Sequence, residues 1–167
     1  MISMDTTHKN ALPKTSLKWM AVLRIMVGLM FLTTWGFNLL EGFYTPDGLS
    51  RFFTELYPQT ENPLAFYAGF INGVILPARS VFAPFQLVTE GLMGLALLIG
   101  AFTPLFSLAG IFFLANTFLA TLGHDWPWSY FLPIGILIVT LFTQAGRAWG
   151  VDASLLRRFG ERGRLLW

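Results

Sequence analysis

A single glutamate, Glu90, is the residue of this chain best placed to do chemistry. It lies inside a long apolar run and is flanked by Val88, Thr89 and Leu92. An ionised carboxylate in hydrocarbon costs several kcal/mol unless it is paired, hydrated or protonated. A carboxyl group in such surroundings is the kind that accepts protons from a reduced quinol, although the spacing of its neighbours indicates no particular ligand.

Two further polar residues in apolar runs form a candidate site with Glu90. At a helical rise of ~1.5 Å per residue, Asn116 falls at a similar depth in the next, antiparallel helix, which predicts a hydrogen bond between Glu90 and Asn116. Arg24 lies about two turns into the first apolar run, so its side chain would extend toward Glu90 or toward the lipid headgroups. Two interpretations stay open: a polar clamp that fixes the helix register, or a proton-accepting or ligand-binding site within the bundle.

The adjacent residues His124 and Asp125 form a second candidate site. The carboxylate would orient the imidazole as a proton relay or as an axial ligand at the outer membrane surface. The neighbouring tryptophans favour a plainer interpretation, because tryptophan gathers at membrane interfaces as an anchor. Basic and aromatic residues after the last apolar run are expected to anchor its inner end in the same way. The predicted membrane anchors are Trp126, Trp128, Arg147 and Trp149.

Cysteine is absent from the 167 residues, and histidine occurs only twice. This composition excludes disulfides, thiolate catalysis, cysteine-ligated iron–sulfur clusters and zinc-thiolate sites. His8 lies in a polar tail, so a bis-histidine haem within the spans is excluded and only a single ligand at His124 is left. We predict no metal site, and any redox role must use a partner or a bound organic cofactor.

Apolar helices must position these residues. Hydrophobic residues make up 54% of the chain and charged residues 12%, with a mean hydropathy of +0.60, whereas a soluble domain carries about 25% charged residues. A helix of roughly 20 apolar residues crosses a bilayer core. We therefore predict a single transmembrane domain, residues 17–144, between a cytoplasmic tail of residues 1–16 and a basic cytoplasmic tail of residues 145–167. The predicted spans are about 17–40, 82–102, 105–122 and 130–143.

The long loop between the first two spans, residues 41–81, contains an apolar segment from Leu64 to Ala78. About 15 residues is short for a span, so this segment is predicted to form a re-entrant or interfacial helix. Its Gly69 and Gly73 have the spacing that lets helices pack closely. The predicted fold class is an all-α integral membrane four-helix bundle with a short re-entrant or interfacial helix in the first outer loop.

Proline, glycine and aspartate mark the predicted helix ends. Pro84 is expected in the first turn of the second span, where its missing N–H costs little, and Thr103–Pro104 is expected to form the tight connection to the third span. Gly146 and Gly150 would either bring helices close together or end the fourth span, and the second role is favoured. Asp152 would cap a short helix on the membrane surface.

The distribution of basic residues predicts the orientation of the chain. Of the eleven Lys and Arg residues, nine lie before Ile25 or after Gln144. Because positive charge marks the cytoplasmic side of membrane helices, an even number of spans with both termini in the cytoplasm accounts for the pattern. The net charge of +2 and the pI near 9.2 are then explained by orientation, with lipid and other membrane subunits as partners and no nucleic acid.

Three stretches of the chain together cover most of Leu23 to Arg158: LRIMVGLMFLTTWGFNLLEG, TEGLMGLALLIGAFTPLFSLAGIFFLAN and AGRAWGVDASLLRR. This order of features resembles the DoxX family, particularly its DoxD-like branch, which is related to the small subunit of thiosulfate:quinone oxidoreductase. Asn38 stands where such proteins often have lysine. The family positions carried over to this chain are Arg24, Gly28, Gly36, Glu90, Gly91, Gly100, Gly146 and Arg147.

The resemblance implies a four-helix membrane protein linked to quinone-coupled sulfur oxidation, redox homeostasis or accessory roles. We expect an accessory subunit of a quinone-linked redox or electron-transport complex in the inner (plasma) membrane of a prokaryote, with a candidate quinone or proton site. The alternative is a purely structural subunit that stabilises a respiratory or photosynthetic membrane assembly. Whether the chain is an enzyme is left open, and quinone is the one cofactor that the resemblance suggests.

Overall fold

The computed structural model describes residues 16–163, and this part of the chain is helices and turns without a strand. It confirms the all-α prediction. Of the predicted tail of residues 1–16, only Ser16 is among the described residues. Arg164, the last arginine, lies outside them. The helices are α1 Leu17–Leu40, α2 Pro46–Arg51, α3 Ala65–Phe70, α4 Arg79–Ile99, α5 Thr103–Ala120, α6 Trp128–Thr143 and α7 Val151–Phe159, with π-helical turns at Phe52–Leu56 and Ile71–Ile75 and 3-10 turns at Ala145–Arg147 and Gly160–Gly163.

Three helices are long and apolar enough to cross a membrane. They are α1, α4 and α5, with 24, 21 and 18 residues. The fourth apolar helix, α6, has 16 residues, a length of about 24 Å at the usual helical rise. The structure therefore supports a helical membrane protein, with α6 as the shortest member of the group.

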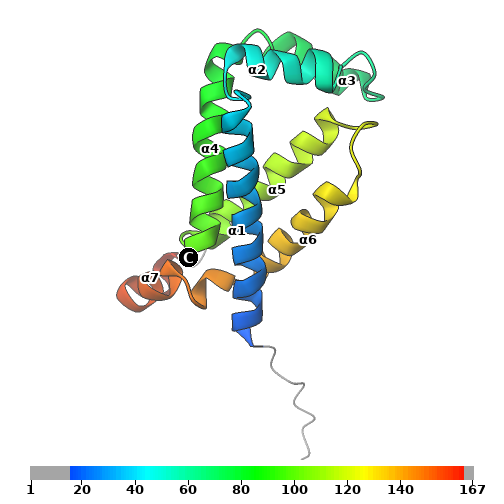
Figure 1. The fold of residues 1–167 in the computed structure, drawn as a ribbon. Coiled ribbons are helices and arrows are strands. Elements are labelled where there is room, and N and C mark those ends of the chain that lie inside the picture. Colours follow the sequence, from blue (N-terminus) through cyan, green and yellow to red (C-terminus); the bar gives the residue numbers. More distant parts are fainter. Residues whose placement is uncertain (1–15, 164–167) are drawn as a thin grey trace, which may run out of the picture.

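The long helices pack in two pairs. Helix α1 lies antiparallel to α4 along most of its length, and α5 lies beside α6; the second pair leans away from the first toward the end of the molecule that carries α2 and α3 (Figure 1). A hydrophobic cluster fills the space between all four helices, and its members include Phe31, Leu97, Leu114 and Leu137. The core residues come from α1, α4, α5 and α6, so they join the two pairs.

Glycine makes the close contact between α1 and α4 possible. A Cβ atom on Gly28 would lie 2.6 Å from the backbone nitrogen of Leu98, and one on Gly94 would lie 2.9 Å from the side chain of Leu32. Close helix packing through small residues is the usual device in membrane helices. The same role predicted for Gly69 and Gly73 is wrong, because a Cβ on either would meet no described atom within 4 Å.

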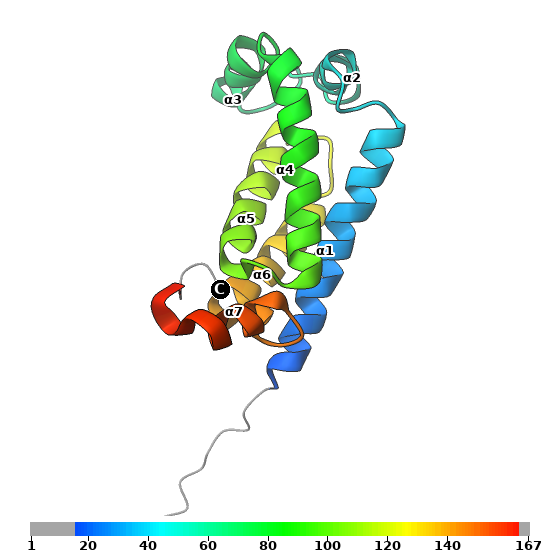
Figure 2. The same ribbon diagram turned by 90° about the vertical axis from the view of Figure 1, so that its left-hand side faces the viewer.

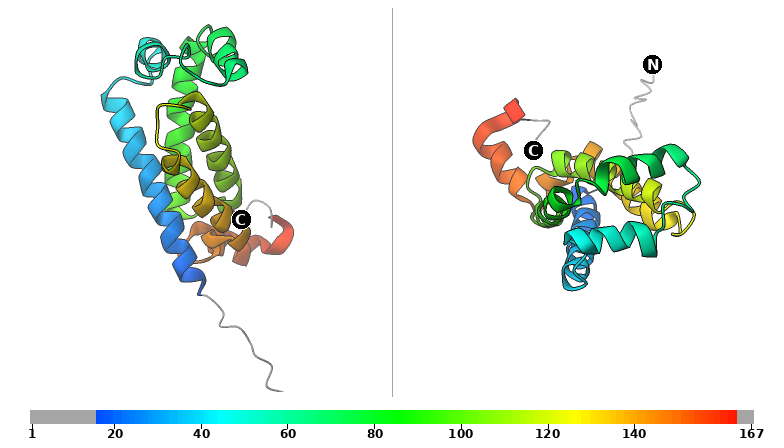
Figure 3. Two further views of the ribbon diagram at one scale, coloured as in Figure 1. Left: turned by 90° about the vertical axis from the view of Figure 1, so that its right-hand side faces the viewer. Right: turned by 90° about the horizontal axis from the view of Figure 1, so that it is seen from above.

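Residues 46–75 form a layer across the end of the bundle, and we call this layer the roof (Figure 2, Figure 3). The predicted helix in Leu64–Ala78 is present as α3 and the π-helical turn after it, and it lies across the bundle end instead of entering the bundle. Helix α2 was not predicted from the sequence. A second hydrophobic cluster holds the roof on α4 and α5. Its buried members are Leu49, Phe53, Tyr67, Ile71, Ile75, Ala83 and Ala120.

Two predicted span boundaries are wrong by a few residues. Helix α4 begins at Arg79, so Pro84 lies inside it and not in its first turn. Helix α5 begins at Thr103 with Pro104 in its first turn, so the connection is the preceding turn of Gly100 to Phe102. Both ends of that turn have positive φ, 68° at Gly100 and 49° at Phe102.

Asp152 explains why α5 begins where it does. Its carboxylate accepts hydrogen bonds from the backbone amides of Phe102 and Thr103, at 2.7 and 2.9 Å, and its own amide donates to the carbonyl of Gly100 at 2.9 Å. The prediction that Asp152 caps its own helix is therefore wrong: it caps α5, some 50 residues earlier in the chain, and supplies the acceptor that first-turn amides need. The beginning of the predicted tail, from Ala145 to Asp152, thus packs against the bundle.

The glycines near α7 also have a different role from the one favoured by the sequence. Helix α6 ends at Thr143, before Gly146. A Cβ on Gly146 would collide with the Asp152 carboxylate and the Thr103 hydroxyl, and a Cβ on Gly150 would lie 2.6 Å from the guanidinium of Arg24. Their function in the fold is close approach. We call Arg24, Gly100, Gly146, Gly150 and Asp152 together the clasp.

Candidate functional site

A cavity of about 580 Å³ lies between the diverging helix pairs and beneath the roof. This is within the range of roughly 300–1,000 Å³ that small-molecule sites occupy. Its walls come from α1, α4, α5, the start of α6 and the roof, and aromatic side chains dominate them. The polar side chains on its surface include Asn38, Gln86, Thr89, Glu90, Asn116 and Asp125. Three residues singled out from the sequence, Glu90, Asn116 and Asp125, thus share one cavity.

Glu90 is 1% exposed and is hydrogen-bonded by groups from two parts of the chain. The hydroxyl of Tyr44, four residues beyond the end of α1, donates to Oε2 of Glu90 at 2.7 Å, and the Gln86 side chain also hydrogen-bonds the carboxylate. Asn38 donates to the Tyr44 hydroxyl at 3.5 Å. Burial, with the Glu90 charge and hydrogen bond, raises the pKa of Tyr44 above its usual value, so the phenol keeps its proton.

Asn116 faces the same cavity but has other partners. The Tyr67 hydroxyl donates to its backbone carbonyl and to its side-chain oxygen, both at 3.0 Å, and its amide group donates to the carbonyl of Phe112 at 2.7 Å. The predicted hydrogen bond between Glu90 and Asn116 is not present among the described residues. The reason is the divergence of α4 and α5 toward the roof, which places the cavity between these two side chains.

Arg24 lies in the clasp and not beside Glu90. It is fully buried and donates to the carbonyls of Ala145, Ala148 and Trp149 at 3.3, 3.4 and 3.2 Å. These carbonyls follow the end of α6 and need donors, and the Asp152 carboxylate offsets the charge of the guanidinium. Both directions predicted for its side chain, toward Glu90 and toward the headgroups, are therefore wrong.

Asp125 forms the far polar wall of the cavity. It accepts hydrogen bonds from the hydroxyls of Tyr57, at 2.9 Å, and Tyr130, and Thr121 donates to the Tyr130 hydroxyl at 2.9 Å. Burial, and then the hydrogen bond to Asp125 and its charge, raise the pKa of Tyr57 to about 12. Asp125 thus joins the roof, through Tyr57, to the start of α6.

His124 contacts Glu61 and Tyr57 and does not share the hydrogen bonds of the adjacent Asp125. Its Nε2 lies 3.9 Å from the carboxylate of Glu61 in the turn before α3, and its ring meets the edge of Tyr57 at 5.8 Å between centroids. The described residues contain no hydrogen bond between His124 and Asp125, because the latter is engaged by two tyrosines. They also contain no group of three or more His, Cys, Asp or Glu side chains that would hold a metal ion. An axial-ligand or relay role for His124 stays a prediction.

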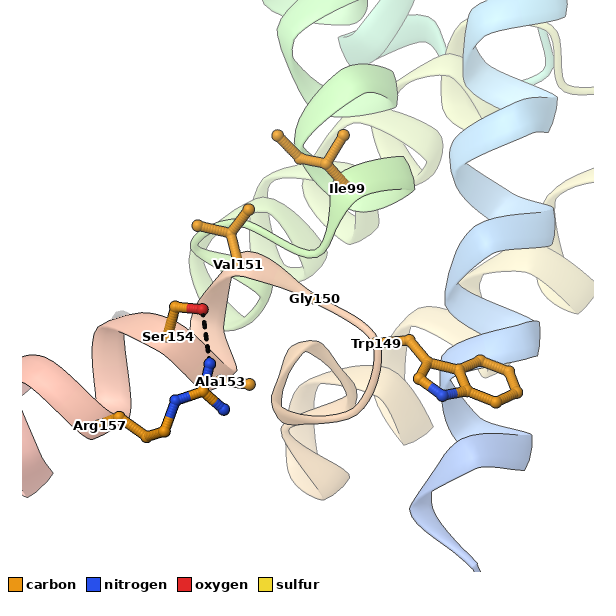
Figure 4. Close-up of a pocket in the computed structure, with 7 residues that line it drawn as sticks. All are labelled: Ile99, Trp149, Gly150, Val151, Ala153, Ser154 and Arg157. Carbon is orange, nitrogen blue, oxygen red and sulfur yellow. Dashed lines mark hydrogen bonds between the residues drawn. The ribbon is translucent and has the colours of Figure 1, made fainter.

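The predicted anchors lie at the two ends of α6. Trp126 and Trp128 are 70% and 62% exposed at the roof end, and Trp149 is 62% exposed at the clasp end. Arg147 lies in the 3-10 turn after α6. Figure 4 shows Trp149 directed toward α1 while Val151 points to Ile99 of α4. Anchoring in a membrane stays a prediction for all four residues.

Three tyrosines that hydrogen-bond the two cavity carboxylates were not predicted from the sequence. From the sequence, Tyr44 was not connected with Glu90, and Tyr57 and Tyr130 were not connected with Asp125. Tyrosines close to the ends of apolar spans are a usable signal, since buried phenols need acceptors. The partner of each tyrosine depends on how the chain reverses after α1, which no local pattern encodes.

These features define an all-helical integral membrane protein with a roofed, aromatic cavity that has a carboxylate on each of two walls. The chain belongs to the DoxD family: a family model described as "TQO small subunit DoxD" matches residues 19–167. The DoxD-like resemblance is thereby confirmed over nearly the whole chain. No curated protein and no solved structure matches the chain.

Proposed function

We propose that the chain is a membrane subunit of a quinone-linked oxidoreductase and that the roofed cavity receives the quinone ring. The observation that carries the proposal is the position of Glu90 on the wall of a cavity of about 580 Å³. Its carboxylate is buried and accepts a hydrogen bond from the Tyr44 hydroxyl, and the chain belongs to a family named for a quinone oxidoreductase subunit. Aromatic walls suit a planar ring, because such rings pack in offset or edge-to-face arrangements.

The polar wall of the cavity suits proton exchange with a quinone oxygen. Tyr44 and Gln86 offer hydrogen-bond donors, and Glu90 can hold a proton between them. The quinone supplies the two-electron chemistry when it is bound. The chain has no cysteine with which to hold an iron–sulfur cluster, so we propose that the electrons come from a partner subunit and that this chain binds and positions the acceptor.

We also propose that four helices, α1, α4, α5 and α6, cross the inner membrane of a prokaryote with both termini in the cytoplasm. The start of α1 and helix α7 lie at the same end of the bundle (Figure 1), and α7 carries Arg157 and Arg158 in its last turn. From Glu41 to Arg79 and in the turn between α5 and α6, the roof end carries five acidic residues against two arginines. This asymmetry supports a cytoplasmic clasp and an external roof.

Substitution of Glu90 tests the proposed site in the assembled complex. Glu90→Gln keeps the shape and loses the proton-holding group, and it is expected to lower quinone reduction by at least about tenfold without changing subunit assembly. The matched control is Glu61→Gln, which changes a carboxylate that is 67% exposed near the roof.

The second candidate function is purely structural, and the tyrosines support it, because they satisfy Glu90 and Asp125 within the fold. In that case Glu90→Gln would leave quinone reduction unchanged, purified complex would carry no quinone at this subunit, and the only effect would be on stability. That set of results would end the proposal of a quinone site.

A further inference from the structure

The cavity has a polar edge and an apolar edge on α4. Glu90 lies on the side of α4 nearest to Tyr44 and Asn38 at the end of α1. Phe85 also lines the cavity, and it lies five residues earlier, about 140° around the helix. It is therefore on the side of α4 that faces away from α1, and it is 59% exposed.

Helix α5 presents a matching apolar edge. Gly110 packs on Leu137 of α6, with a Cβ position only 3.0 Å from that side chain, so this side of α5 faces α6. Phe112 lines the cavity and lies about 160° around the helix from Gly110. It is 71% exposed and sits on the side of α5 away from α6. Phe85 and Phe112 therefore border the cavity where α4 and α5 diverge.

The roof completes this border with a third phenylalanine. Phe70 of α3 lines the same cavity and is 41% exposed, and α3 lies above the roof end of α5, on the side of α4 away from α2 (Figure 2). Three exposed aromatic side chains from three elements thus share one rim of the cavity. In a bilayer this rim faces hydrocarbon, which neither hydrates nor repels an apolar chain.

We propose that Phe70, Phe85 and Phe112 form a lateral opening to the bilayer, the portal, through which the hydrocarbon tail of the ligand extends. The inference rests on the proposed quinone site and adds to it the class of ligand: a ring with a long hydrocarbon chain, taken from the membrane and not from water. The ring lies at the Glu90 wall and the chain leaves between α4 and α5, so the polarity of the cavity matches the polarity of the ligand along its length.

The absence of cysteine allows a direct test, because any introduced thiol is the only one in the chain. In Phe112→Cys a bulky maleimide label would stand in the portal. The control is Leu108→Cys, one turn earlier on α5, which is 58% exposed and does not line the cavity. Two quinones with the same ring, one with a long isoprenoid tail and one without a tail, are then titrated into each labelled and unlabelled protein in nanodiscs, with thermal unfolding as a check of folding.

The label at position 112 is expected to weaken binding of the tailed quinone by roughly tenfold or more and to leave the tailless quinone unchanged. The label at position 108 is expected to change neither. Equal effects on both quinones, or no effect of the label at position 112, would overturn the portal while the quinone site stands. Failure of the unlabelled protein to bind the tailless quinone would instead remove the proposed site, and the portal with it.

Discussion

Removal of the buried Asp152 carboxylate is expected to destabilise the fold at its clasp end. The side chain is 1% exposed and accepts from the amides of Phe102 and Thr103. In Asp152→Ala, two amides lose their acceptor, at about 1–3 kcal/mol each, and the buried guanidinium of Arg24 loses the carboxylate that offsets its charge. We expect a loss of about 3–5 kcal/mol in the free energy of unfolding, with Asp152→Asn intermediate because it keeps one acceptor oxygen.

The assay is equilibrium unfolding of the purified protein in mixed micelles with increasing SDS, followed by tryptophan fluorescence. The control is Asp47→Ala, which removes an exposed aspartate from the first turn of α2 and is expected to cost less than about 1 kcal/mol. A loss at Asp152→Ala no larger than that of the control would refute the assignment of Asp152 as the cap of α5 and as the counter-charge of Arg24.

Three further predictions concern packing, ionisation and topology. Gly28→Ala, whose new Cβ would lie 2.6 Å from the α4 backbone, is expected to cost about 1–3 kcal/mol in the same unfolding assay, whereas Gly69→Ala, which meets open space, should be near neutral. Tyr57 has a pKa of about 12 against about 10 in the unfolded chain. Its contribution to stability is therefore full below pH ~10 and is lost as the pH rises toward 12. The phenolate absorbance difference between wild type and Tyr57→Phe should appear only above pH ~11. A single thiol in Leu56→Cys should react with an impermeant maleimide from outside intact cells and one in Ser154→Cys should not; the reverse pattern, or labelling of both, would contradict the proposed topology.

The long apolar helices could be predicted because their signal is local. Length and hydropathy are properties of contiguous residues, and α1 matches its predicted bounds at both ends. The third and fourth helices were each placed within two residues of an observed start, since Gly, Pro and the polar turn residues mark these ends. The roof was only partly predicted, because its helices are short and its aromatic residues show no helical period.

The contacts of the candidate site could not be predicted, because each joins residues distant in the chain. The Tyr44–Glu90 hydrogen bond spans 46 positions and follows a reversal at Gly42, where φ is 73°. The sequence places Asn116 at the depth of Glu90, but depth gives no lateral distance, and the two helices diverge around a cavity. The partners of Arg24 could not be predicted either, because the carbonyls that bind it belong to a turn over 120 residues later.

The clasp has a consequence for biosynthesis. The first helix to leave the ribosome carries Arg24, whereas the carbonyls that accept its hydrogen bonds belong to Ala145, Ala148 and Trp149, and the offsetting carboxylate to Asp152. Until residues 145–152 have been synthesised, the guanidinium must therefore be solvated by water and phosphate near the headgroups. A chain truncated before residue 145 would retain every long apolar helix, but the Arg24 guanidinium would lack these acceptors. Membrane proteases and chaperones can recognise such a charged group in an apolar helix.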